Sequence, residues 1–78
     1  MRRPFKQLTK RQQWQSIVSR LNKAIGELEQ LVIDGNYFNG LPKMANEVPL
    51  DLEEYRVEAT RLKKQLADFV RQNPPESI

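Results

Sequence analysis

The fold of this chain is decided by WQSIVSRLNKAIGELEQLV, residues 14–32, and by LEEYRVEATRLKKQLADF, residues 52–69. In both stretches apolar residues recur at alternating steps of three and four, which places them along one seam of an α-helix. The first seam consists of Trp14, Val18, Leu21, Ile25, Leu28 and Val32, and the second of Leu52, Tyr55, Ala59, Leu62, Leu66 and Phe69. Two such seams bury each other when the helices pack together. We therefore predict an all-α fold, an antiparallel two-helix hairpin.

Capping signals set the expected ends of the two helices. Thr9 is followed three residues later by Gln12, a capping box that starts the first helix at residue 9. Gly35 is the residue type that commonly follows a helix C-terminus, so this helix is expected to end near residue 34. Asp51 predicts the start of the second helix, and Pro74 stops it. The predicted organisation is a basic arm at 1–8, a hairpin at 9–73 with helices at about 9–34 and 51–73 and a long ordered loop at about 35–50, and a flexible tail at 74–78.

Size and composition limit how the chain is stabilised. It has 78 residues, with no cysteine and no histidine, so it lacks the disulfides and zinc ligands of many small domains. Stability must come from helix packing, from oligomerisation, or from both. No apolar run approaches the roughly 20 residues that cross a bilayer, and no apolar segment follows the basic N-terminus. We expect a soluble, cytoplasmic protein that does not contact membranes.

The first helix carries a wider apolar face than one neighbouring helix covers. A second row, at Ile17, Ala24 and Leu31, widens its apolar arc to about 140°, against about 100° in the second helix. Two coverings fit: the loop folds back with Tyr37 and Phe38, or a second chain docks to form a four-helix bundle. We predict the homodimer. The predicted self-association residues are Trp14, Ile17, Val18, Leu21, Ala24, Ile25, Leu28 and Leu31.

Trp14 has two interpretations. Aromatic residues are enriched in binding hot spots, so it is a candidate partner anchor. The antiparallel hairpin also places it beside the end of the second helix, where it would close the open end against Phe69 and Val70. The second role is the simpler one for a tryptophan that continues the apolar seam.

Charge is unevenly distributed along the chain. Residues 1–23 hold seven Lys or Arg and no acid, residues 24–60 hold eight acids against two bases, and residues 61–78 hold four bases against two acids. In a hairpin the basic segments meet at the open end and the acidic segment lies toward the loop. Lys10 and Arg11 also oppose the dipole of the first helix, and locally unfavourable choices can mark functional sites.

The residue types argue against an enzyme. There is no histidine or cysteine to act as a general base or nucleophile, no glycine-rich phosphate loop follows a strand, and the helical seams contain no charge. We expect no catalytic residues, no cofactor, no metal and no small-molecule substrate.

Two sets of residues are candidates for binding a partner. Tyr37 and Phe38 stand between turn-forming residues of the loop and form a candidate recognition tip, with capping of the closed end as their simpler role. The other set is basic and either grips phosphates or an acidic protein surface, or only keeps the surface soluble. This set comprises Arg2, Arg3, Lys6, Lys10 and Arg11.

Our leading hypothesis is a non-enzymatic protein-binding module, a regulator, inhibitor or adaptor. The alternative is a nucleic-acid-binding protein whose basic pole adds Lys64 and Arg71 to the basic set. A third interpretation is a structural subunit of a larger assembly.

Overall fold

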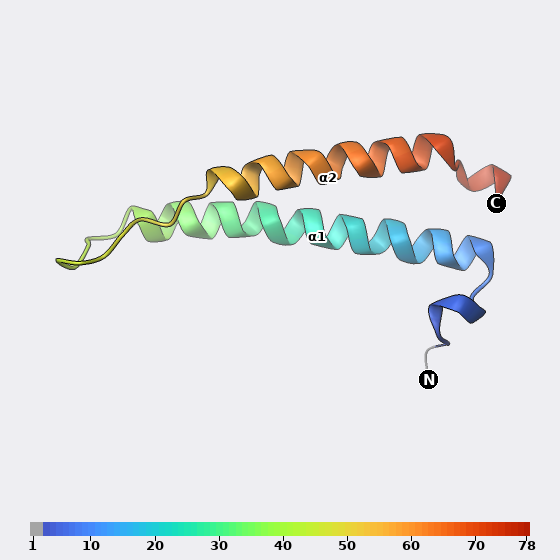
Figure 1. Cartoon of the computed structure of the whole chain (residues 1–78), viewed down its shortest axis with the longest axis horizontal. Coiled ribbons are helices and arrows are strands. Elements are labelled where there is room, and N and C mark those ends of the chain that lie inside the picture. The colour runs from blue at the N-terminus through green and yellow to red at the C-terminus, as the bar shows by residue number, and fades with distance from the viewer. Residues whose placement is uncertain (1–2) are drawn as a thin grey trace.

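The computed structural model describes residues 3–78, which form a two-helix hairpin (Figure 1). Helix α1 spans Lys10–Asn39 and helix α2 spans Glu53–Gln72, and the two run antiparallel side by side. Two short 3-10 turns flank them, η1 (Phe5–Gln7) before α1 and η2 (Pro75–Ser77) after α2. All the regular structure in residues 3–78 is helical, which confirms the predicted all-α hairpin.

The hairpin is a single layer of helices. It measures 56 × 31 × 14 Å, and the buried apolar side chains of the described chain are those of Ile25, Leu52 and Ala59. The other residues of the two seams are only half-buried along the line where the helices meet: Trp14, Val18, Leu21, Leu28, Val32, Tyr55, Leu62, Leu66 and Phe69. A layer of this thickness has two broad faces that neither helix can cover.

The start of α1 follows from its capping box. The Thr9 hydroxyl accepts a hydrogen bond from the Gln12 backbone N–H at 3.1 Å, and the Gln12 side chain accepts one from the Thr9 N–H at 3.0 Å. The amide of Gln13 donates to the carbonyl oxygen of Phe5 at 3.0 Å, which ties η1 to the helix. The described part of the arm predicted at 1–8, residues 3–8, is therefore a compact turn beside α1, and Arg2 lies outside the described residues.

The predicted end of α1 was wrong. The helix does not stop near residue 34 but continues to Asn39, and Gly40 follows it as the C-cap. Gly35 lies inside the helix, buried, with a negative φ. Its role is steric: a Cβ built there would lie 2.5 Å from Cδ2 of Leu52 and 3.3 Å from Cδ2 of Leu50. The missing side chain lets the chain entering α2 pack directly on the α1 backbone.

We expect the two glycines inside α1 to respond oppositely to substitution. Gly26 has no atom within 4 Å of the Cβ position, so Gly26→Ala should stabilise the protein by up to about 1 kcal/mol through helix propensity. Gly35→Leu should destabilise it by about 1–3 kcal/mol because it displaces buried Leu52. Thermal and urea denaturation followed by circular dichroism measure both. A melting temperature that rises equally for the two would contradict the packing described here.

Helix α2 begins two residues later than the sequence predicts. Leu52 occupies the N-cap position, and the Asp51 carboxylate accepts a hydrogen bond from the Glu53 N–H at 3.1 Å. Burial explains the shift, because Leu52 inserts against Gly35 before the helix starts. Glu53 and Glu54 occupy the first turn, where carboxylates complement the helix dipole. Among the helices of residues 3–78, none combines the length and apolarity that crossing a membrane requires.

Candidate functional site

The closed end of the hairpin is held by one side chain. The Asn39 amide donates to the carbonyl oxygen of Leu50 at 2.8 Å, and the Leu50 N–H donates to the Asn39 side-chain oxygen at 2.9 Å. Within the loop, the Met44 N–H donates to the Glu47 carboxylate at 3.0 Å, and the Glu47 N–H donates to the Met44 carbonyl at 3.1 Å. The connection between the helices is thus clamped at its base and turned tightly at its tip.

The clamp gives a test of loop order. Asn39→Ala removes both hydrogen bonds to Leu50, and we expect a loss of about 1–2 kcal/mol in the free energy of unfolding. The larger effect should be local, with faster amide exchange across the loop and little change at Ile25 in the middle of α1. Hydrogen exchange read by mass spectrometry distinguishes these regions. Unchanged exchange in the loop would show that Asn39 does not hold it.

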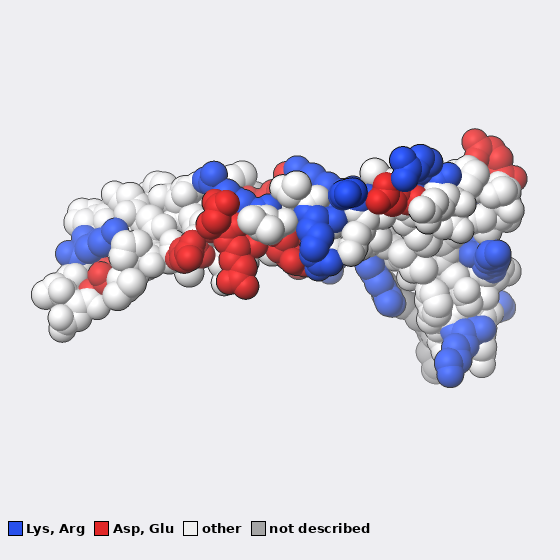
Figure 2. Space-filling view, turned by 45° about the horizontal axis from the view of Figure 1, so that its top comes forward, with Lys and Arg blue, Asp and Glu red and all other residues white. Residues whose placement is uncertain are grey.

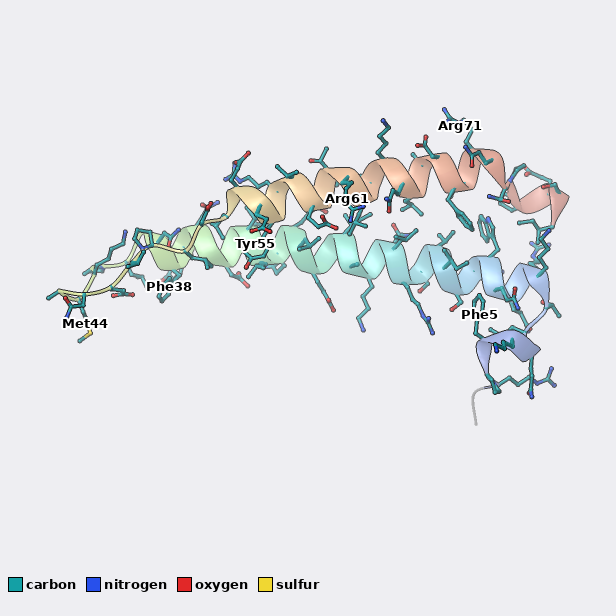
Figure 3. The ribbon with its side chains drawn as sticks, in the orientation of Figure 1. Phe5, Phe38, Met44, Tyr55, Arg61 and Arg71 are labelled. Carbon is teal, nitrogen blue, oxygen red and sulfur yellow. The ribbon has the colours of Figure 1, made fainter. Side chains whose placement is uncertain are left out.

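Apolar side chains gather around this clamped end and stay exposed. Tyr37 is 74% exposed, Met44 81% and Val48 80%, and the space-filling surface of this end is mostly uncharged (Figure 2). Figure 3 shows Phe38 on the last turns of α1 and Met44 at the tip of the loop. We call this group the closed-end patch: Ile33, Tyr37, Phe38, Leu41, Met44 and Val48. The returning loop touches α1 near Gly35 and Asn39, but its apolar side chains at Leu41, Met44 and Val48 stay exposed instead of covering the apolar face of α1. Tyr37 does not cap the hairpin.

The charges near the patch are mainly acidic. Glu53 and Glu54 begin α2, and on α1 the Asp34 carboxylate accepts a hydrogen bond from Gln30 at 2.9 Å. Figure 2 shows most of the acidic surface of this half gathered inward of the uncharged end, with a smaller acidic area near the tip. Lys43 and Glu47 are the two charged residues of the loop tip between Gly40 and Pro49. The patch is therefore an apolar surface with an acidic border.

Trp14 closes the open end of the hairpin. Its indole Nε1–H donates to the carbonyl oxygen of Asn73 at 2.7 Å, just past the end of α2. The Asn73 amide in turn donates to the Phe69 carbonyl oxygen at 3.1 Å, which finishes the helix. The structure thus gives Trp14 an intrachain role, although the sequence also suggested it for self-association.

The described members of the basic set lie at the open end of the hairpin: Arg3, Lys6, Lys10 and Arg11. Lys10 and Arg11 form the exposed first turn of α1, and η1 carries Lys6 just after Arg3. A shallow groove separates the turn from the helix, lined by Arg3, Phe5, Leu8, Gln12, Ser16 and Arg20. The open end is not purely basic, because Arg71 forms an ion pair with Asp68 at 2.9 Å. Acidic surface borders these bases in Figure 2.

The other predicted self-association residues divide into two groups. Val18, Leu21, Ile25 and Leu28 lie in the seam against α2. The second group lies beside the seam: Ile17 and Ala24 are half-buried, and Leu31 is 37% exposed. Phe38 continues this second row at the same spacing of seven and is 50% exposed. The spacing of seven that links Leu31 to Phe38 is visible in the sequence. Phe38 was missed as a member of this row because the first helix was expected to end near residue 34.

Among residues 3–78, no cluster of acidic side chains is arranged to hold a metal ion. The groove on one side of the helices holds Glu29 and Lys63, but these form an ion pair at 2.7 Å. A hydrogen bond from Arg61 holds the pKa of Glu58 below its ordinary value. The contribution of that exposed pair is small, and it is lost as the pH falls through the lowered pKa.

No family model, characterised protein or solved structure matches this chain. Its function therefore has to be argued from its own surfaces.

Proposed function

We propose that this chain is a small non-enzymatic protein-binding module that works as a homodimer of helical hairpins and recognises a protein partner through the closed-end patch. The observation that carries the proposal is the exposure of Tyr37 at the end of α1 and of Met44 and Val48 on a clamped loop. Monomeric proteins rarely expose large contiguous apolar surface, and such patches mark interaction sites. Tyrosine, phenylalanine and methionine are also the residues enriched at the centres of protein interfaces.

The order of the patch supports binding. Tyr37 and Phe38 project from the last turns of α1, and the Asn39 hydrogen bonds fix where the loop returns. Pro42 and Pro49 restrict the loop further. Little conformational entropy remains to be lost when a partner docks, so more of the contact energy appears as affinity.

The charges around the patch indicate the chemistry of the partner. An acidic border repels nucleic acid and anionic membrane surfaces but complements a basic rim around an apolar pocket. The closed end therefore fits a protein with an apolar groove flanked by Lys or Arg. A regulator, inhibitor or adaptor acts by occupying such a groove.

The basic set supports a second candidate, nucleic-acid binding. Lys6, Lys10 and Arg11 lie together at the open end, and none of the ion pairs between described residues involves them. Such a cluster would hold backbone phosphates with little sequence preference, and its affinity would fall steeply with salt. In residues 3–78 no recognition helix follows a short helix-to-helix turn, so base readout is not part of this alternative.

Affinity capture separates the two candidates. The tagged protein is incubated with a native lysate of its source at moderate salt, in parallel samples with and without nuclease. The proposal expects one stoichiometric protein that survives nuclease, both for the native chain and for a variant in which the basic set is changed to Gln. If the captured protein is lost after nuclease treatment, or is captured by the native chain but not by the Gln variant, the proposal is rejected and the nucleic-acid candidate is favoured.

A further inference from the structure

The two broad faces of the hairpin are chemically different. The groove on one face is lined by charged and polar residues as well as apolar ones, and its Lys63 ammonium forms an ion pair with the Glu29 carboxylate at 2.7 Å. The lining residues are Glu29, Val32, Ile33, Arg56, Ala59, Thr60 and Lys63. The other face carries what we call the flank row: Ile17, Ala24, Leu31 and Phe38. At roughly 100° per residue, positions seven apart differ by only about 20° around a helix, so these four residues form one stripe along α1.

Helix α2 extends the apolar character of this face. Tyr55, Leu62 and Phe69 are also spaced by seven, and all three are half-buried. At about 100° per residue they fall on the side of the α2 seam away from Arg56 and Lys63. Stable domains bury such a face against a second layer, and the described chain supplies one layer 14 Å thick.

The charge pattern of α1 indicates what the second layer is. The first half of the helix, 10–23, holds Lys10, Arg11, Arg20 and Lys23 and no acid, whereas the second half, 24–39, holds Glu27, Glu29 and Asp34 and no base. Another α1 laid across it in the opposite direction brings the basic half of each helix against the acidic half of the other. Within one chain, the basic residues lie at the positive end of the α1 dipole and the acidic residues at its negative end, which is unfavourable. In the antiparallel pair the two α1 dipoles also point in opposite directions, which is favourable.

We infer that a second copy of this chain covers the flank-row face, antiparallel, with the two-fold axis perpendicular to the long axis of the hairpin. The axis passes between Ala24 and Leu31, so that Ala24 of each copy meets Leu31 of the other, and Ile17 meets Phe38. The smallest side chain of the stripe, Ala24, then faces Leu31, and the largest, Phe38, faces Ile17. A two-fold axis along the hairpin instead would set both basic ends together. This inference rests on the homodimer in the proposed function. It assigns Phe38 to the dimer interface and leaves the rest of the closed-end patch, including Tyr37 and Met44, for the partner.

The register also makes a specific ionic contact. With the axis near residue 27, Arg20 of one copy lies level with Asp34 of the other, at the edge of the flank row. Symmetry makes this contact twice. Arg20 is exposed beside η1, and Asp34 is exposed on α1, so both are free to reach across the edge of the interface.

Sedimentation equilibrium tests whether the face is an interface. The native chain should be a dimer, and Leu31→Glu should raise its dissociation constant by about 30-fold or more. Val57→Glu is the matched control, because Val57 is also an exposed apolar residue but lies on the outer side of α2. It should remain dimeric. A monomeric native chain, or a dimer that Leu31→Glu leaves intact, would overturn the inference.

Charge reversal tests the orientation. Arg20→Glu and Asp34→Arg should each weaken the dimer about tenfold, since each puts like charges together twice, and the double variant should restore it. The chain has no cysteine, so Glu27→Cys gives a single thiol beside the axis that a short bis-maleimide should link into a covalent dimer. Failure of the double variant to restore dimerisation, or absence of the Glu27→Cys cross-link, would overturn the antiparallel arrangement. Tyr37 and Met44 lie outside the flank row, so the two proposals can fail separately. If the native chain is a monomer and still captures the partner, the dimer inference fails and the closed-end patch stands.

Discussion

Trp14→Ala is expected to lower the free energy of unfolding by about 3 kcal/mol, close to the low end for truncating a large aromatic because the indole is only half-buried. Two contributions combine: the lost packing of the ring at the open end, and the lost hydrogen bond from Nε1 to the Asn73 carbonyl oxygen. With only three buried apolar residues in the described chain, few other contacts hold the two helix ends together. For a domain of this size the melting temperature should fall by roughly 10–20 °C.

The control is Trp14→Phe, which keeps most of the ring and removes only the donor to Asn73. It should cost about 1 kcal/mol, the usual net value of one hydrogen bond. Circular dichroism melts at one fixed protein concentration give both numbers, since the stability of a dimer depends on concentration. A Trp14→Ala protein that melts with the native one would mean that the open end is not closed by this residue.

The closed-end patch gives the second large effect, in binding rather than stability. Tyr37→Ser combined with Met44→Ser removes two large side chains of the closed-end patch, 74% and 81% exposed, without touching a buried residue. The melting temperature should change little, because surface substitutions away from special contacts are nearly neutral. Partner recovery in the capture experiment should fall by about 30-fold or more, as expected when hot-spot residues are lost.

Val57→Ser is the matched control for that variant. Val57 is exposed on α2, away from the loop, so its substitution removes apolar surface without changing the closed end. Equal loss of partner with both variants would point to non-specific adhesion of apolar surface. Full recovery with the tip variant would place the partner elsewhere on the molecule.

The hairpin itself was predictable from the sequence. The two apolar seams have a helical period, and the pairing of Thr9 with Gln12 is a local signal that the structure reproduces as a capping box. Both depend on neighbours within one helical turn. No long-range information is needed to recognise them.

Gly35 shows why the end of α1 was missed. A glycine after an apolar seam is a typical C-terminal signal, but the same residue also allows two backbones to approach closely. The second role depends on Leu52, seventeen positions away, whose side chain occupies the space. Sequence spacing alone does not show that contact. The error also hid Phe38 as the fourth member of the flank row.

The candidate interaction residues were predictable only in part. Tyr37 and Phe38 were identified from the turn-forming residues around them, but their exposure depends on how the loop leaves the helix. The exposure of Met44 and Val48 could not be predicted, because a loop has no periodic pattern that separates buried from exposed positions. Their exposure follows from the Asn39 clamp on Leu50, a contact between residues eleven positions apart.

The most direct test of the central claim is hydrogen–deuterium exchange of the chain alone and in complex with the captured partner. In the free protein the amides of residues 41–50 should exchange faster than those of the helices, because this segment is exposed and outside them, but more slowly than an unstructured chain, because the N–H groups of Met44, Glu47 and Leu50 are hydrogen-bonded. The account predicts that the partner slows exchange across residues 37–50 and leaves the open end, including Lys10 and Arg11, unchanged. Protection at the open end with none at the loop would contradict the closed-end patch as the recognition surface and would move function to the basic set.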